Sequence, residues 1–309
     1  MGAIYTQIPI DVPGRGDMSP LVCKRRNKVA EKRRSFFEDI YRKLKKIDYI
    51  EEQPLELKVR QDFTQEEKEK AGWTSPNYSK SKTIKLNMNT LADNRCVAIF
   101  PYARETEVYK VLRTKILQHT KEKGGNTIMI TSALPGEGKT LTAINLSFTF
   151  AKLFNQTVLL VDGDLRQQGI HKQLGFVSDR GLIDHLVDDR PVSEIITWPG
   201  IDKLTLISGG RLIHENTELL GSTKMAGLVQ EMKTRYPDRY VFFDAPPILS
   251  RADTLALVPL VDYIIIVVQT GKTPISDVKK ALELIPQEKV IGFVLNRYNA
   301  PAQTHQPSA

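Results

Sequence analysis

The sequence is poor in cysteine and in long apolar runs. Only Cys23 and Cys96 occur among 309 residues, and their spacing is not that of a paired-thiol motif. We therefore expect no disulfide framework and a reducing, cytoplasmic compartment. The longest strongly apolar run, residues 263 to 268, suits a buried strand and is far too short to cross a bilayer. Residues 1 to 6 lack the pattern of a signal peptide and match a myristoylation pattern only weakly.

Positive charge is concentrated near the N-terminus. The formal net charge is +8, and residues 24 to 46 hold eleven Lys and Arg against three acidic residues, so this stretch accounts for the whole excess. Apolar side chains recur there at helical spacing, which predicts a basic amphipathic helix near residues 28 to 47. Such a helix docks on its own domain, or it binds an anionic membrane surface or an acidic partner. Nucleic acid is the least favoured partner, because no DNA-binding motif accompanies the charge.

Composition divides the chain into three parts. Residues 1 to 95 are expected to be a basic, largely flexible N-terminal region, in which residues 48 to 95 have the polar, weakly periodic composition of a linker. Residues 96 to 299 are expected to form the folded domain. Residues 300 to 309 are polar, contain two prolines and are expected to be a disordered tail.

Strands and helices alternate along the folded domain. A helix is predicted from Arg104 onward. Short apolar runs then predict six strands, at residues 127–132, 157–161, 203–208, 240–243, 263–268 and 290–295. Residues 225–236 and 276–285 are examples of the helices between them. This alternation predicts an α/β fold with a mostly parallel sheet and helices on both faces.

A glycine-rich loop joins the first predicted strand to the next helix. Residues 133 to 140 read Ala-Leu-Pro-Gly-Glu-Gly-Lys-Thr, a Walker A P-loop with alanine in place of the usual first glycine. The loop turns backbone N–H groups and the positive end of a helix toward phosphate, the lysine reaches the β- and γ-phosphates, and the threonine hydroxyl holds Mg²⁺. The expected nucleotide-binding residues are Pro135, Gly136, Glu137, Gly138, Lys139, Thr140 and Leu141.

Carboxylates follow two further strands. Asp162 and Asp164 come directly after one strand, and Asp244 comes after another. Ligands of an open α/β sheet bind beyond the carboxyl ends of its strands, so we expect these groups to meet at the loop. An isolated aspartate in such a place is commonly a helix N-cap. Two such strand ends behind a P-loop instead favour Mg²⁺ bound to a nucleotide triphosphate, with one carboxylate orienting or deprotonating a hydroxyl.

With these motifs the chain resembles the bacterial tyrosine kinases of polysaccharide export, P-loop autokinases of the deviant Walker type that work with chain-length-determinant membrane proteins. The resemblance covers residues 100 to 298 and is closest to the free-standing cytoplasmic form, especially the exosortase-associated subgroup. It rests on the loop at 133–140, a D-x-D-x-R motif ending at Arg166, and a third motif at residues 241 to 247. Relatives that position septa or partition plasmids usually carry a signature lysine where this chain has Leu134.

The resemblance implies roles for individual residues. Lys139 and Thr140 would hold phosphates and Mg²⁺, Asp164 and Asp244 would organise Mg²⁺, and Asp162 would activate a tyrosine hydroxyl. Arg166 is implied to support the catalytic site or a subunit contact, and Asn296 with Arg297 to line the adenine pocket. Self-association is implied through the helix that carries Glu107, Lys110 and Arg113, although lysine replaces an arginine of the family's pattern and lacks its bidentate fork.

The implied function is an ATP-dependent protein tyrosine autokinase that regulates exopolysaccharide or capsule biosynthesis and export. ATP and Mg²⁺ are the implied cofactors, and a chain-length-determinant membrane protein is the implied partner. The basic helix suggests a peripheral position at the inner face of the plasma membrane. One departure is that no tyrosine follows Tyr298, where the family has a tyrosine cluster.

That departure leaves open an ATP-switched scaffold without phosphotransfer, and a partitioning ATPase that uses the basic arm on DNA is a more distant alternative. Any acceptor is expected in a flexible segment, because an ordered one would have to unfold locally to reach a site. The candidates are Tyr5, Tyr41, Tyr49 and Tyr78, with Tyr78 first. Tyr109, Tyr236, Tyr240 and Tyr263 are expected to be packing residues, and Tyr298 follows the last strand too closely to swing far.

Overall fold

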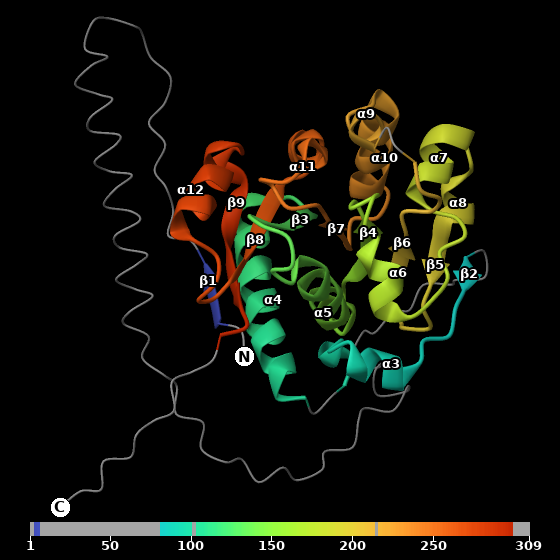
Figure 1. Ribbon diagram of the computed structural model, residues 1–309. Helices are drawn as coiled ribbons and strands as arrows, with labels where there is room; N and C mark the ends of the chain where they lie inside the picture. Colours follow the sequence, from blue (N-terminus) through green and yellow to red (C-terminus); the bar gives the residue numbers. More distant parts are fainter. Residues whose placement is uncertain (1–2, 7–80, 101–102, 214–215, 299–309) are drawn as a thin grey trace, which may run out of the picture. The chain divides into compact units, whose positions relative to one another are not determined.

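A parallel sheet forms the centre of the structure (Figure 1). The computed structural model describes residues 3–6, 81–100, 103–213 and 216–298. In this part the strand order is β1-β9-β8-β3-β7-β4-β6-β5-β2. The six expected strands are β3 (Thr127–Ser132), β4 (Thr157–Asp162), β6 (Leu204–Ile207), β7 (Arg239–Asp244), β8 (Tyr263–Gln269) and β9 (Val290–Asn296). Neighbours among these six all pair in parallel, so the expected fold is confirmed.

Helices cover both faces of this sheet. Ile128, Ile130 and Phe242 are buried in one cluster with side chains of α4 (Arg104–Lys123) and α5 (Lys139–Ala151), the helices in front of the strands in Figure 1. The intervening Met129 and Phe243 are fully buried as well. Successive strand side chains point to opposite faces, so the second face is also covered. Helix α10 (Thr223–Thr234) packs against β7.

The remaining helices connect the strands in chain order. They are α6 (Gly169–Leu174), α7 (Leu182–Asp188), α8 (Val192–Ile195), α9 (Asn216–Leu220), α11 (Ala252–Leu257) and α12 (Ile275–Glu283). The helices expected at 225–236 and 276–285 are confirmed as α10 and α12, each beginning and ending one or two residues earlier. Frayed ends explain such shifts.

The sequence-based boundary at residue 95 is wrong, because residues 81 to 95 belong to the folded domain. Helix α3 (Met88–Asp93) is capped by Asn87, whose side chain accepts hydrogen bonds from the first turn, and it buries Leu91 completely. Cys96 is buried in the same core. Asn145 of α5 fixes the segment by accepting from the N–H of Ala98 at 2.8 Å and donating to the carbonyl of Arg95 at 3.1 Å. Asn145 lies about 50 residues further along the chain, so the polar local sequence gave no sign of these contacts.

Three short edge strands were not expected. β5 (Ile196–Trp198) is antiparallel to β6, β2 (Lys82–Thr83) extends that edge, and β1 (Ala3–Thr6) is antiparallel to β9. Edge strands of two to four residues satisfy open backbone groups of their neighbour but carry too little periodicity to be read from sequence. Tyr5 lies opposite Phe293 in this pairing, so its expected place in a flexible segment is wrong.

The tyrosines of the folded domain differ in exposure. Tyr240 and Tyr263 are buried, as expected for packing residues, and the Tyr240 hydroxyl lies 2.7 Å from that of Thr120. Tyr236 is 40% exposed instead, because α10 ends at Thr234 and leaves it in the connection to β7. Tyr41, Tyr49 and Tyr78, the basic helix near 28–47 and the tail 300–309 lie outside the described residues. Within the described ranges, every helix is too short or too polar to cross a membrane.

Candidate nucleotide site

The loop between β3 and α5 has the backbone of a phosphate cradle. Gly136 and Gly138 adopt φ values of 79° and 97°, which residues with a Cβ rarely adopt. A Cβ on Gly138 would also lie 2.0 Å from the side-chain nitrogen of Asn296. Helix α5 begins at Lys139 directly after this glycine. The N–H groups of Lys139, Thr140 and Leu141 open the helix and have no carbonyl one turn back, so they are available to an anion.

The Glu137 side chain is turned away from the cradle. It is 2% exposed, accepts the N–H of Leu134 at 2.7 Å, and accepts the hydroxyl of Thr273 from the loop after β8. Glu137 can therefore contribute to the phosphate site only through its backbone. Its carboxylate ties the loop to the end of β8, a role that nothing in the local sequence indicated.

Asn296 ends β9 beside this loop, and Arg297 follows it. The amide of Asn296 donates to the carbonyl of Glu137 at 2.8 Å. Arg297 has a left-handed backbone, with φ of 56°, and its guanidinium donates to the side chain of Gln269 at 3.1 Å. The end of β9 thus flanks the loop on the side opposite the carboxylates of β4.

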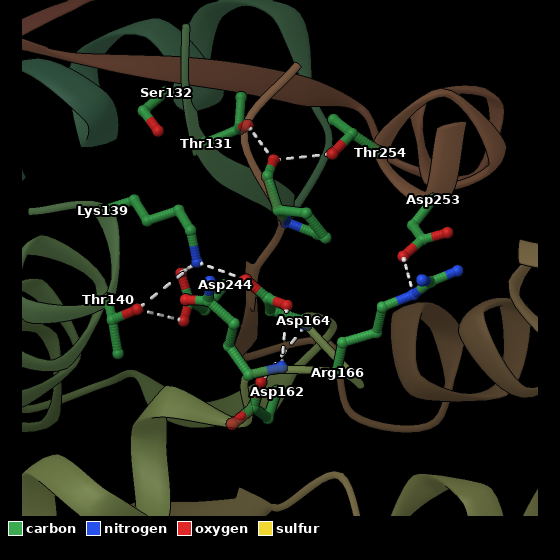
Figure 2. A network of polar contacts seen from close by, with 12 residues as sticks. Thr131, Ser132, Lys139, Thr140, Asp162, Asp164, Arg166, Asp244, Asp253 and Thr254 are labelled. Carbon is green, nitrogen blue, oxygen red and sulfur yellow. Dashed lines mark hydrogen bonds and ion pairs between the residues drawn. The ribbon is translucent and has the colours of Figure 1, made fainter. Parts of the chain in front are cut away.

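Four of the predicted site residues converge at the start of α5 (Figure 2). The ammonium of Lys139 lies 2.9 Å from Asp164 Oδ2 and 3.4 Å from Asp244 Oδ1. The hydroxyl of Thr140 donates to Asp244 Oδ2 at 2.6 Å. β4 and β7 are neighbouring parallel strands, with Asp162 opposite Asp244, so their carboxyl ends deliver these groups together.

Asp162 is held by backbone N–H groups and not by Lys139 or Thr140. Its two carboxylate oxygens accept the N–H groups of Asp164 at 3.2 Å and of Ile170 at 3.1 Å. Since Ile170 lies in the first turn of α6, the N-cap alternative holds in part for this aspartate. Asp162 therefore fixes the D-x-D turn that presents Asp164.

The site contains more negative than positive charge. Asp162, Asp164 and Asp244 are fully buried, and Lys139 is the cation among them. Burial and the charges of Asp244 and Asp164 raise the pKa of Asp162 well above its ordinary value, and burial raises the pKa of Asp244 despite Lys139. Burial opposes ionisation of Lys139, but Asp244 and Asp164 outweigh it and raise its pKa. A further cation would relieve this cluster.

Magnesium bound to a nucleotide fits the cluster. Carboxylate and hydroxyl oxygens are the donors that Mg²⁺ prefers, and Thr140, Asp164 and Asp244 supply them. In the ranges that the structure describes, no three His, Cys, Asp or Glu side chains are placed to hold a metal by themselves.

Arg166 does not join the cluster. Its Nε lies 3.7 Å from Asp253 Oδ2 on α11, on the far side of the D-x-D turn in Figure 2. Asp253 is 1% exposed, and its other oxygen accepts the hydroxyl of Thr217 from α9. Leu257, also on α11, would lie 3.0 Å from a Cβ on Gly163. Sequence reasoning missed Asp253 and Thr217, since the contacts join segments that are separate in the chain.

The residues implied in self-association have contacts within the chain. Arg113 donates to the carbonyl of Thr149 at 2.6 Å and so joins α4 to α5. Lys110 pairs with Glu107 at 2.6 Å on the surface of α4. Glu107 therefore lies exposed on the surface of α4, whereas Arg113 has a role within the chain.

Known proteins are similar to this chain in sequence. The family model described as an AAA domain matches residues 125–290, more than half of the chain. The tyrosine-protein kinase YwqD of Bacillus subtilis (strain 168) is 32% identical over 198 residues, which are 63% of this chain and 82% of that protein. The succinoglycan biosynthesis transport protein ExoP of Rhizobium meliloti (strain 1021) is 29% identical over 215 residues, 66% of this chain but 26% of ExoP.

A solved structure extends the likeness to the fold. The crystal structure of the chimerical protein CapA2B2 matches with a TM-score of 0.61 and 26% identity, over 77% of this chain and all of that one. Fold, loop and sequence similarity therefore agree with the resemblance drawn from the motifs. The chain belongs to the AAA domain family and to the bacterial tyrosine-protein kinases.

Proposed function

We propose that this protein is an ATP-dependent protein tyrosine autokinase that regulates exopolysaccharide or capsule assembly and export. The observation that carries the proposal is the convergence of Lys139 and Thr140 on Asp164 and Asp244, behind a loop shaped for phosphate. The names of the kinase YwqD and the transport protein ExoP support the activity and the polysaccharide context.

In the proposed reaction a tyrosine oxygen attacks the γ-phosphorus of ATP. The new phosphorus–oxygen bond forms as the bond to the β,γ-bridging oxygen breaks, and ADP leaves with that electron pair. The loop N–H groups and Lys139 hold the phosphates. Mg²⁺, when bound by Thr140, Asp164 and Asp244, neutralises phosphate charge. Asp162 takes the phenolic proton, a role that suits a carboxylate whose pKa is raised by burial and by its neighbours Asp244 and Asp164.

Asn296 and Arg297 are proposed to contact the adenine. The hydrogen bond from Asn296 to the backbone of Glu137 in the loop supports this proposal. Arg166, which faces Asp253 and not the phosphates, is proposed to support the D-x-D turn. An arginine at this place would act on the reaction through Asp164.

The test is phosphorylation of the purified protein. Full-length protein incubated with Mg²⁺ and ATP should acquire phosphotyrosine, detected by mass spectrometry, and the Asp164→Asn variant should not. Asp277→Asn is a matched control, because Asp277 pairs with exposed Lys280 on the same helix, α12. ATP hydrolysis without phosphotyrosine in the wild type would contradict the kinase proposal.

An ATP-switched scaffold is the second candidate. It is favoured by the packing of Tyr240 and Tyr263, which removes two tyrosines of the folded domain from reach of another subunit. A scaffold would hydrolyse ATP and change its assembly state with nucleotide while the same mass spectra remain free of phosphotyrosine. Light scattering with ATP and with ADP would show that change.

The expected partner is a chain-length-determinant membrane protein, with the basic segment 24–46 as a membrane contact. Each Lys or Arg near an anionic surface contributes about 1 kcal/mol before screening by salt. Changing Arg33, Arg34, Arg42 and Lys43 to glutamine should reduce co-sedimentation with vesicles that contain anionic lipid. A control with four exposed domain lysines changed, at positions 85, 121, 123 and 272, should still sediment. Equal sedimentation of both variants and the wild type would contradict the contact.

A further inference from the structure

We propose that Tyr236 accepts phosphate from the nucleotide site of a second copy of this chain; the inference rests on the proposed kinase activity. Among the tyrosines whose side chains the structure describes, Tyr236 is the exposed one, at 40%. Tyr240 and Tyr263 are each 8% exposed, and Tyr109 and Tyr298 are partly buried. A phenol must be reachable to attack a phosphate, so the folded domain offers this tyrosine first.

Two arginines flank the Tyr236 ring. The guanidinium carbon of Arg239 lies 4.0 Å from the ring centroid, and that of Arg235 lies 5.7 Å from it. A phosphotyrosine carries a charge of about −1.5 to −2 at neutral pH, and guanidinium groups are its preferred hydrogen-bond partners. Arg235 also pairs with Glu231 at 2.5 Å, a surface contact that a doubly charged phosphate can compete with. The modified side chain therefore has counter-charges in place.

Tyr236 cannot reach the nucleotide site of its own chain. It lies next to the first residue of β7, Arg239, whereas Asp244 is the last residue of that strand. Six residues of strand span about 20 Å, and β7 is buried inside the sheet. The backbone is also fixed locally, because the carbonyl of Tyr236 accepts the N–H of Arg239 at 3.1 Å. Transfer must therefore occur between two copies.

The transfer follows the reaction already described. The Tyr236 oxygen of one copy attacks the γ-phosphorus of ATP bound to the other, ADP leaves, and Asp162 of the ATP-bound copy takes the phenolic proton. The products are phosphotyrosine at 236 and ADP.

The first experiment maps phosphate on the full-length chain after incubation with Mg²⁺ and ATP. Trypsin would release only residues 236 to 239, so a protease that cleaves at acidic residues is needed. We expect phosphate at residue 236, its loss in Tyr236→Phe, and reduced occupancy in Arg239→Gln. Tyr298→Phe is the matched control and should leave occupancy at 236 unchanged.

The second experiment tests the direction of transfer. Two chains are mixed. The affinity-tagged chain carries Asp162→Asn and cannot donate phosphate; the untagged chain carries only Tyr236→Phe and cannot accept phosphate at residue 236. Phosphate at residue 236 of the tagged chain is the expected result. Should Asp162→Asn fold poorly, Thr140→Val serves as the recipient instead.

The outcomes separate this inference from the proposed function. Phosphotyrosine at residues 41, 49 or 78 with none at 236 overturns the Tyr236 assignment and leaves the kinase proposal standing. Phosphotyrosine nowhere overturns both. Transfer between copies is overturned if residue 236 of dilute, monomeric protein is phosphorylated at a rate that does not depend on protein concentration.

Discussion

The hydroxyl of Thr140 donates a hydrogen bond to the carboxylate of Asp244 at 2.6 Å, across 104 residues of sequence. This contact joins the first turn of α5 to the end of β7, and so aligns the loop with the third motif. Both oxygens are hard ligands, and both face the cluster that Lys139 neutralises only in part. We therefore expect the pair to hold Mg²⁺ when nucleotide is present.

Thr140→Val should abolish Mg²⁺-dependent turnover, because it removes a metal oxygen and leaves Asp244 Oδ2 without its hydrogen-bond donor. Thr140→Ser keeps the hydroxyl and should retain most of the activity. The measurement is ATP hydrolysis over a titration of Mg²⁺, with thermal unfolding to confirm folding. Equal Mg²⁺ dependence in the two variants would count against a metal role for Thr140.

Lys139→Met should remove nucleotide binding and also destabilise the protein. Lys139 is 8% exposed and is the counter-charge of two buried carboxylates. Removing one partner of a buried ion pair typically costs about 3–5 kcal/mol. Denaturant unfolding and fluorescent nucleotide binding would measure the two effects. A variant as stable as the wild type would show that the carboxylates take up protons at little cost.

Asp162 should make the nucleotide-free protein less stable as pH rises. Burial, together with Asp244, raises the pKa of Asp162 in the folded state above its unfolded value of about 3.9. The folded state therefore binds the Asp162 proton more tightly than the unfolded state does. The contribution of this proton to the free energy of unfolding is fully present below about pH 4 and is lost as pH rises through the pKa of Asp162 in the folded state.

The measurement is the free energy of unfolding of the wild type minus that of Asp162→Asn, across this pH range without metal. Asp179→Asn is a control of opposite sign, because the hydrogen bond from Lys82 lowers the pKa of Asp179. Binding of Mg²⁺ with nucleotide should release a proton and tighten with rising pH over the same window. A difference that grows with pH would be inconsistent with the buried carboxylate.

Asp253→Asn should raise the Mg²⁺ concentration needed for half-maximal turnover several-fold. Asp253 holds Arg166, which lies two residues after Asp164, so losing this ion pair loosens the turn that presents Asp164. Arg166 is half exposed, so the loss of stability should be only about 1 kcal/mol. Nucleotide affinity without Mg²⁺ should change little. The matched control is Glu231→Gln, which removes a surface ion pair on α10.

Arg113→Ala should destabilise the folded domain by about 1–2 kcal/mol, because it removes a charged hydrogen bond between α4 and α5. Glu107→Ala should leave stability unchanged and weaken self-association, since Glu107 is exposed and pairs only with Lys110. Unfolding curves and sedimentation velocity separate the two effects. If Arg113→Ala loses self-association while its stability is unchanged, Arg113 acts at the subunit interface and not between α4 and α5.

The sequence by itself determined the central sheet and the chemistry at its carboxyl edge. Six apolar runs are long enough to show strand periodicity, and the glycine loop with Lys139 and Thr140 is local in sequence. Asp162 and Asp244 end their strands, Asp164 comes two residues after Asp162, and parallel strands deliver their carboxyl ends to one edge. Each of these features depends on short-range patterns, so each could be read before the fold was known.

Only the tertiary structure decided which side chains face the site. Glu137 and Arg166 both lie in motifs, yet one turns to Thr273 and the other to Asp253. The same limit applies to residues 81 to 95, whose polar composition hides a helix and the backbone after it that Asn145 fixes. These partners are far apart in the chain and are brought together only when the sheet and helices pack. Local sequence fixes a residue's chemistry, but the direction of its side chain depends on neighbours that folding supplies.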